Sequence, residues 1–291
     1  MEGVSLFAVT YLILIPVFVY WVIGKRRGLF TLASYFLCAG LNALVKLTAC
    51  VYRPWIRDPR IIPAGDSIET ATGYSFPSGH TITAGTIYGG TALSLWKPAR
   101  LFSILCLILV FLTGFSRNYL GVHTPQDVIV GVLEAALVLF VVEKLFMHVE
   151  KKIESEIIVL SIFFAIGWLG MAYVTYKSYP MDYIDGKLLV DPMKMKADGY
   201  TNLGYLIAFP VARLFEKSFV KFKPAGPNLK GIVMGGIGTV SLYLMIKYLK
   251  PLVHSSVGYY LGRFAFSFIL VFYCVALYPM IIKLVMRGFR K

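Results

Sequence analysis

The chain has 291 residues, of which 58% are hydrophobic and only 15% are charged, with a mean hydropathy of +0.72. Soluble domains carry about 25% charged residues, so this composition excludes an ordinary water-soluble globule and a disordered chain. The 29 Lys and Arg outnumber the 15 Asp and Glu, giving a net charge of +14, but a nucleic-acid-binding surface does not usually accompany this hydrophobicity. The remaining class is a protein that crosses a membrane several times.

Nine segments of the chain are apolar enough to be membrane helices. A crossing helix needs about 20 mostly apolar residues, and somewhat fewer where its ends lie in polar pockets. We therefore predict an all-α, polytopic transmembrane helical bundle of about nine spans. In chain order these are residues 4–24, 30–51, 79–96, 101–116, 127–142, 157–176, 200–215, 231–248 and 257–282.

Basic residues are concentrated in alternate connections between these spans. Lys25, Arg26 and Arg27 follow the first span and nothing basic precedes it, which is not the pattern of a cleaved signal peptide. The positive-inside rule then predicts an N-terminus outside and a C-terminus in the cytoplasm. Short loops favour a multi-pass protein of a bacterial plasma membrane. The other connections on the predicted inner side are also basic, at residues 97–100, 144–152, 217–230 and 287–291.

The first of three unusual polar stretches lies at the end of the second span. Lys46 and Arg53 are seven residues apart, which is two helical turns, so we expect both cations on one face of a helix that Pro54 ends. A lysine buried at a membrane boundary needs an anionic partner. The alternative is a pair of basic side chains that extend to the membrane surface.

The second stretch begins the third span. Ser78 is a good N-cap, and Gly79 allows a ligand to approach the helix N-terminus, where free amides and the helix dipole favour an anion. His80 would lie over that site with a pKa near the operating pH. The alternative interpretation of this stretch is an ordinary helix cap.

The third stretch joins the fourth and fifth spans. Arg117 precedes it, and Thr124 and Pro125 are suited to the cap and first position of a helix, which makes Asp127 the third helical residue. His123 is then close enough for the Asp127 carboxylate to fix its tautomer and leave the other ring nitrogen free. The alternative is a Thr/Asp capping box with a histidine before it by chance.

All three stretches fall on the predicted outer face, and together they suit phosphoryl transfer. Lys46, Arg53 and Arg117 would neutralise the phosphate oxygens. His123 would attack phosphorus, and His80 would protonate the leaving alkoxide and then activate a water. Because the cations supply the positive charge and no acidic cluster could hold Mg²⁺, we expect no metal and no other cofactor.

These residues resemble the three signature motifs of the type 2 phosphatidic acid phosphatase family, which is related to the vanadium haloperoxidases. The motifs are Lys-x6-Arg-Pro, Pro-Ser-Gly-His and Ser-Arg-x5-His-x3-Asp, and all eleven specified positions match. The resemblance implies a helical bundle with a metal-independent site at the non-cytoplasmic membrane surface. It also implies His123 as nucleophile, Asp127 as its orienting carboxylate, His80 as general acid, and Lys46, Arg53, Arg117, Ser78 and Gly79 as phosphate-binding residues.

The order of the spans differs from that of six-span members of this family. Those members place the first two motifs after their third helix, whereas here the motifs follow the second, as in the glucose 6-phosphatase and sphingosine-phosphate phosphatase branches. We expect residues 1–156 to carry the first five spans with all three motifs. Residues 157–291 would carry the last four spans, whose role is unassigned, within one integrated membrane domain.

Several polar residues lie outside the motifs. Glu134 and Arg263 fall within spans, where ionisable groups are functional candidates, although we favour local hydrogen bonds for both. The polar stretch 178–199 is a candidate outer lid. His148 and His254 lie in or beside predicted loops and lack partners at a useful spacing, so we expect both to be solvated.

The preferred function is a lipid phosphate phosphatase that acts at the outer leaflet through a phosphohistidine intermediate. Its expected partners are membrane lipids and a phosphorylated lipid, either phosphatidic acid-like, a sphingoid phosphate or an isoprenyl pyrophosphate; no nucleic acid is expected, and the oligomeric state is left open. A phosphatase for a soluble sugar phosphate, resembling glucose 6-phosphatase, is the first alternative. A lipid-binding or transport protein on the same bundle is the second, and a vanadate-dependent oxidase is disfavoured because those relatives are soluble.

Overall fold

The computed structural model describes residues 11–65, 67–71 and 73–288. Its elements are helical apart from one short hairpin, which confirms the all-α prediction. Four π-helical turns, labelled η, interrupt or extend the α-helices. In chain order the elements are α2 (Leu14–Phe18), η1 (Val19–Ile23), α3 (Lys25–Ala49), α4 (Pro54–Arg57), α5 (Ser67–Thr70), α6 (Gly79–Leu95), α7 (Arg100–Tyr119), α8 (Pro125–Lys151), α9 (Ser155–Tyr176), β1 (Tyr183–Ile184), β2 (Lys187–Leu188), α10 (Pro192–Phe215), η2 (Glu216–Val220), α11 (Leu229–Leu244), η3 (Met245–Leu249), α12 (Lys250–Val257), α13 (Tyr259–Phe272), η4 (Tyr273–Leu277) and α14 (Tyr278–Gly288).

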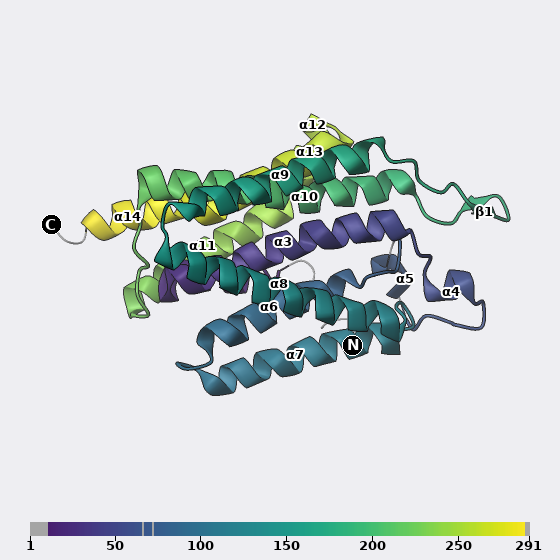
Figure 1. Ribbon diagram of the computed structural model, residues 1–291, viewed down its shortest axis with the longest axis horizontal. Coiled ribbons are helices and arrows are strands. Elements are labelled where there is room, and N and C mark those ends of the chain that lie inside the picture. The colour runs from purple at the N-terminus through teal and green to yellow at the C-terminus, as the bar shows by residue number, and fades with distance from the viewer. Residues whose placement is uncertain (1–10, 66, 72, 289–291) are drawn as a thin grey trace.

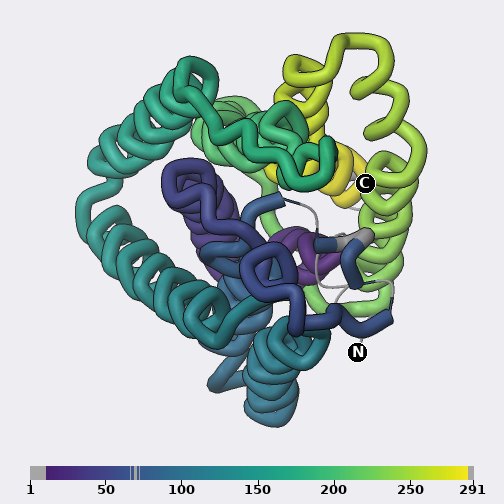
Figure 2. The backbone as a smooth tube through the Cα atoms, turned by 90° about the vertical axis from the view of Figure 1, so that its right-hand side faces the viewer, coloured from purple at the N-terminus to yellow at the C-terminus, as the bar shows by residue number. Residues whose placement is uncertain are grey.

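The long helices run back and forth along one axis, so that their ends gather at two opposite ends of the bundle. The β1–β2 hairpin, α4 and α5 lie at one end, and the C-terminus lies at the other (Figure 1). Helix α3 passes through the middle, between the α8–α9 arc and the C-terminal helices (Figure 2). In the most apolar 18-residue stretch of the helical segment that includes α3, 78% of the residues are buried, whereas the corresponding share is 33% in α7 and in α9. Helix α3 is therefore the core of the bundle.

The outward faces of the peripheral helices are apolar. Large side chains such as Phe111 on α7 and Leu169 on α9 are 70% and 73% exposed. An exposed apolar belt on a helical bundle suits contact with lipid rather than water. With the apolar helices themselves, this makes the chain a multi-pass membrane protein.

Five helical stretches among the described residues are long and apolar enough to cross a membrane by themselves: Lys25–Arg57, Arg100–Tyr119, Ser155–Tyr176, Leu229–Val257 and Tyr259–Arg287. The number nine stays a prediction. Part of the first expected span, residues 4–10, lies outside the described residues. Two helices are longer than expected, since α8 continues past residue 142 to Lys151 and α10 begins at Pro192 instead of residue 200.

The expectation that Lys46 and Arg53 share one face of a continuous helix is wrong. Helix α3 ends at Ala49, and Cys50 adopts a left-handed conformation with φ of 47° while its N–H still bonds to the Lys46 carbonyl. Arg53 is extended and precedes α4, in which Pro54 occupies the first helical position instead of ending a helix. The chain turns sharply between the two cations.

Other sequence expectations have mixed outcomes. The segment expected as a lid forms the hairpin and the first turns of α10, and it contacts the motif region: the Tyr52 hydroxyl donates to Asp182 Oδ2 at 2.5 Å. His148 lies on α8 and is exposed, as expected. The expectation for His254 is only partly right, because it lies within α12, half-buried, with its ring edge-on to Phe266.

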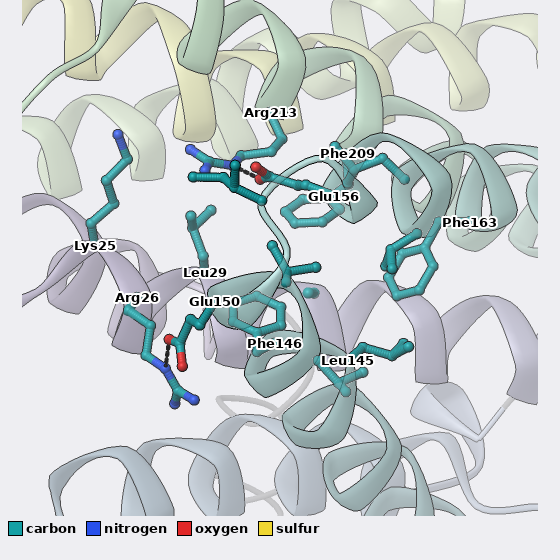
Figure 3. A pocket seen from close by; sticks show the side chains of 16 residues that line it. Lys25, Arg26, Leu29, Leu145, Phe146, Glu150, Glu156, Phe163, Phe209 and Arg213 are labelled. Carbon is teal, nitrogen blue, oxygen red and sulfur yellow. Dashed lines mark hydrogen bonds and ion pairs between the residues drawn. The ribbon is translucent and has the colours of Figure 1, made fainter.

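An ion-paired cluster closes the end of the bundle opposite the hairpin. Fully buried Glu216 receives Lys25 Nζ at 2.6 Å and Arg213 Nη1 at 2.5 Å, and Arg213 Nε also pairs with Glu156 at 2.7 Å. Arg213 and Glu156 lie at the rim of a mainly apolar cavity of about 300 Å³, with Arg26 across from them (Figure 3). Glu216 thus ties the start of α3 to the end of α10.

Replacing Glu216 with Gln is expected to destabilise the protein strongly. The change leaves the half-buried cations Lys25 and Arg213 with less compensating charge, a loss on the order of 3 kcal/mol. Thermal unfolding in detergent measures the effect, and the exposed Glu154→Gln variant is the matched control. Equal unfolding midpoints for the two variants would contradict the assigned role of Glu216.

Candidate active site

The three motif stretches meet at the hairpin end of the bundle, where α3 ends, α6 begins and α7 connects to α8 (Figure 1). A cavity of about 360 Å³ lies there between these segments and the C-terminal helices α10, α12 and α13. Five of the predicted site residues line it: Lys46, Arg53, Gly79, His80 and His123.

The His123 ring is held from both sides in a buried position. Its Nε2 lies 2.8 Å from Arg53 Nη1, and its Nδ1 lies 3.3 Å from Asp127 Oδ2. Arginine is a donor only, so Nε2 must be the accepting nitrogen, and the ring proton is on Nδ1, directed at the carboxylate. These contacts require the tautomer predicted from the sequence, but the other ring nitrogen is not free as predicted, because Nε2 accepts from Arg53 Nη1.

Burial changes the acidity of His123 as well. Removal from water and the nearby Arg53 guanidinium lower the pKa of the His123 imidazole well below 6.5, against the opposing effect of Asp127. The ring is therefore neutral at neutral pH. A neutral imidazole with an unprotonated Nε2 is the form that can act as a nucleophile.

Asp127 combines the two roles that the sequence presented as alternatives. The capping box is present: the Thr124 hydroxyl accepts from the Asp127 N–H, and Asp127 Oδ2 accepts from the Thr124 N–H at 2.8 Å. The same oxygen accepts from His123 and from the Ser75 hydroxyl, the latter at 2.5 Å. The cap of α8 thus fixes the carboxylate that orients His123.

Arg53 is positioned by main-chain carbonyls. Its Nε donates to the Gly73 carbonyl and its Nη1 to the Val122 carbonyl, both at 2.9 Å. Gly73 has φ of +81°, and a Cβ there would lie 2.1 Å from Met195 Sδ, so the turn that presents this carbonyl requires glycine. Arg53 therefore joins the turn before α6 to the loop before α8.

Lys46 has carbonyl partners instead of the anionic partner expected from the sequence. Its Nζ donates to the carbonyls of Tyr74, Ser75 and Pro77 at 3.2, 3.1 and 2.5 Å. An ammonium group has three donors, and these three carbonyls use all of them. Lys46 thus shapes the turn that leads into α6 while it also lines the cavity.

The start of α6 has the predicted cap. The Ser78 hydroxyl accepts from the Thr81 N–H, and the Ser78 N–H donates to the Asp127 carbonyl at 3.0 Å, so Ser78 is buried between α6 and α8 and does not line the cavity. A Cβ built on Gly79 would meet nothing within 4 Å. Protein packing therefore leaves room at Gly79 for a ligand to approach the helix N-terminus.

Arg117 is fully buried at the end of α7 and is not among the residues that line the cavity. Its carbonyl accepts from the backbone N–H groups of Val122 and His123, at 3.2 and 3.3 Å. The structure thus connects Arg117 to the His123 loop through its backbone. Its role in phosphate binding stays a prediction.

Sequence reasoning missed two kinds of residue. Ser75 lies two residues before the second motif and Asn118 lies within the third. Nothing in their spacing indicated that Ser75 would bond to Asp127, or Asn118 Nδ2 to the His123 carbonyl at 2.9 Å. The other kind comes from the C-terminal half and was given no site role. The C-terminal residues that line the cavity are Met195, Asp198, Thr201, Asn202, Tyr205, Lys250 and Arg263.

Both isolated charges within the spans have local partners, as favoured from the sequence. Glu134 Oε2 accepts from Asn42 Nδ2 at 3.0 Å, and Arg263 Nη1 pairs with Asp198 Oδ1 at 2.9 Å. Among the described residues no group of three or more His, Cys, Asp or Glu side chains is arranged to hold a metal ion.

The fold and the site define a polytopic helical membrane protein with a cationic cavity that contains two histidines. The family model of the PAP2 superfamily matches residues 27–151, which include all three motifs. Residues 27–151, less than half of the chain, are therefore similar to the PAP2 superfamily, which supports the resemblance of the motifs to the type 2 phosphatidic acid phosphatase family.

Curated relatives are similar over parts of their length. An undecaprenyl-diphosphatase of Sulfolobus acidocaldarius is 33% identical over 43% of this chain and 60% of its own. Phosphatidylglycerophosphatase B of Bacillus subtilis is 33% identical over 32% of this chain and 48% of its own. A bacitracin transport permease of Bacillus licheniformis is 28% identical over 51% of this chain and 76% of its own. The chain thus spans about half the length of the first two, and no solved structure gives a significant match.

Replacing Gly79 with Ala is expected to weaken the binding of orthovanadate, a phosphate mimic, without destabilising the protein. The new methyl group meets no protein atom but occupies space beside the helix N-terminus. Gly236→Ala on α11 is the matched control, because its Cβ also meets nothing within 4 Å and it does not line the cavity. Titration calorimetry measures the affinity, and equal vanadate affinity in both variants would contradict a ligand site at Gly79.

Proposed function

We propose that the protein is a membrane lipid phosphate phosphatase, which hydrolyses a phosphomonoester or diphosphate head group. The observation that carries this proposal is the buried His123 between Arg53 and Asp127, at the wall of a cavity that Lys46 and His80 also line. A neutral, oriented imidazole next to two cations suits nucleophilic attack on a phosphate group. The match of residues 27–151 to the PAP2 superfamily and the similarity to an undecaprenyl-diphosphatase and a phosphatidylglycerophosphatase support the same activity.

The proposed reaction has two steps. First, His123 Nε2 attacks phosphorus and the bond to the leaving oxygen breaks, with His80 donating a proton to that oxygen. Second, His80 removes a proton from a water, which attacks the phosphohistidine; the P–N bond breaks and orthophosphate and His123 are released. Throughout, Lys46 and Arg53 stabilise the negative charge on the phosphoryl oxygens, and we assign the same role to Arg117.

Arg53 has to change its partner during the first step. Its Nη1 donates to the nitrogen that attacks, so the hydrogen bond must pass from His123 Nε2 to a phosphate oxygen before the attack. The carbonyls of Gly73 and Val122 keep the guanidinium in place during this exchange. Substrate binding would thus both neutralise the phosphate and free the nucleophile.

A second, smaller cavity with a mixed polar and apolar lining adjoins the main one. It measures about 100 Å³ and shares Tyr35, Thr83, Tyr205 and Lys250 with the main cavity. The first carbons of a hydrocarbon chain attached to the phosphate fit against its apolar wall, which supports a lipid over a soluble sugar phosphate as substrate. Its remaining walls are apolar: Leu12, Ile13, Ile87, Ile246, Phe266 and Leu270.

We also propose that the site opens at the non-cytoplasmic face of a bacterial plasma membrane. The motif stretches lie at the hairpin end of the bundle, and the basic connections near residues 97–100, 144–152 and 217–230 lie at the opposite end (Figure 1). Under the positive-inside rule that opposite end is cytoplasmic. This orientation places the N-terminus outside and the C-terminus inside.

Transport is the second candidate function, and the similarity to the bacitracin transport permease of Bacillus licheniformis is the observation that favours it. A transporter needs no oriented nucleophile. The loss of phosphate release on mutation of His123 would therefore distinguish the two functions.

The variant His123→Ala is expected to reduce phosphate release from lipid phosphates to the background level, because it removes the nitrogen proposed to attack phosphorus. Detergent-solubilised protein is assayed for orthophosphate with phosphatidic acid, an isoprenyl diphosphate and glucose 6-phosphate. Exposed His148→Ala is the control and is expected to keep full activity. Retained activity in His123→Ala would refute the mechanism, and a preference for glucose 6-phosphate would overturn the choice of a lipid.

His123 is expected to titrate below pH 6.5. Its pKa is lowered, so the nucleophilic neutral form dominates at neutral pH and is lost only as the pH falls through that lowered value. NMR of ¹⁵N-histidine-labelled protein, with His123→Ala to assign the signal, measures the titration directly and separately from that of the substrate. A His123 pKa at or above 6.5 would contradict the structure.

A further inference from the structure

The cavity beside His123 has a second charged wall, contributed by helices outside the family match. Asp198 lies on α10, Lys250 begins α12 and Arg263 lies on α13, and all three line the cavity. Helix α10 packs between α3 and α13, so this wall is continuous with the core of the bundle. None of these three residues belongs to the family-matched range 27–151.

The charges of this wall are only partly compensated. Arg263 Nη1 pairs with Asp198 Oδ1 at 2.9 Å, which uses the single carboxylate among the cavity-lining residues. Lys250 Nζ makes no hydrogen bond or ion pair with the residues of 11–288 that the structure describes. A half-buried ammonium group inside a membrane bundle is costly, so its position calls for an anionic ligand.

The total charge of the cavity exceeds what one phosphate needs. Its lining contains four cations, Lys46, Arg53, Lys250 and Arg263, and one carboxylate, Asp198. A phosphomonoester carries at most about two negative charges. Arg53 contacts the proposed nucleophile and Lys46 lines the same cavity, so these two cations already match the charge of the phosphate that reacts.

We propose that Lys250 and Arg263 form a second anion-binding subsite, which binds a second phosphate group of the same lipid substrate. This inference rests on the proposed function and narrows it to lipids with two phosphate groups. Such a lipid is either a diphosphate or a phosphodiester that ends in a phosphomonoester. The neutral side chains of Thr201, Asn202 and Tyr205 line the same cavity and add hydrogen-bond donors for the second group.

The decisive variant is Lys250→Gln, which removes a charge without breaking an ion pair. We compare kcat/KM for a lipid diphosphate and for the monophosphate with the same hydrocarbon tail. The ratio of the two values is expected to fall about tenfold or more, as for the loss of a charge-assisted hydrogen bond. Lys247→Gln is the matched control: it lies three residues earlier, is exposed and does not line the cavity, so its ratio should equal that of the wild type.

A double variant tests the other cation. Asp198→Asn together with Arg263→Gln removes both partners of the ion pair and leaves no unpaired charge. In this variant, too, the ratio of kcat/KM for the diphosphate to that for the monophosphate is expected to fall. A second pair of lipids, phosphatidylglycerol phosphate and phosphatidic acid, gives the same kind of ratio for a phosphodiester that ends in a phosphomonoester. The pair of lipids with the larger fall identifies the source of the second phosphate. Wild-type ratios in both variants would overturn the subsite.

Binding of methylenediphosphonate separates this inference from the proposed function. The probe has two phosphonate groups and is not hydrolysed, so calorimetry reports the subsite even if no lipid is a substrate. Tighter binding than orthophosphate in the wild type, weakened at least tenfold in Lys250→Gln, supports the subsite, and equal binding in both proteins overturns it. Failure of the wild type to release phosphate from every lipid would overturn the proposed function alone.

Discussion

The buried imidazole between a guanidinium and a carboxylate is the interaction on which the candidate site depends. His123 is in contact with Arg53 on one side and with Asp127 on the other, at 2.8 and 3.3 Å. Arg53 follows α3, and Asp127 lies in the first turn of α8. The His123 ring therefore connects the segment after the central helix α3 to the start of α8. If either partner moved, the tautomer and the direction of Nε2 would both be lost, because only an accepting nitrogen can face a donor-only guanidinium.

Helix ends supply the precision that this contact needs. The cap that begins α8 holds the Asp127 carboxylate, and the cap that begins α6 is hydrogen-bonded to the Asp127 carbonyl through the Ser78 N–H. A Cβ on Gly131 would lie 3.2 Å from the Ser78 carbonyl, which shows how closely the two helices approach here. Structural capping and chemical orientation are therefore not competing explanations at Asp127, since the rigid cap is what makes the orientation reliable.

The sequence predicted the convergence of the motifs better than it predicted the path between them. The alternation of spans was enough to bring Lys46, His80 and His123 to one end of the bundle. The local geometry was not predictable in the same way: Arg53 lies beyond a left-handed Cys50, and nothing in the residue spacing indicates that the helix ends there. Lys46 illustrates the same limit, because the carbonyl groups that bind it are present at every residue and only the fold selects three of them.

The contribution of the C-terminal half was beyond sequence reasoning for a related reason. Asp198, Lys250 and Arg263 are single charges on three different helices, and no common spacing joins them. Asp198 and Arg263 are explained by their ion pair, and in the sequence Lys250 is one basic residue among many, so none of the three indicates a site by itself. Their shared position on one cavity wall appears only when α10, α12 and α13 are packed together. That wall faces the motif residues across one cavity and lies outside the family-matched range 27–151. The residues proposed to react and the residues proposed to select the lipid therefore come from different parts of the chain.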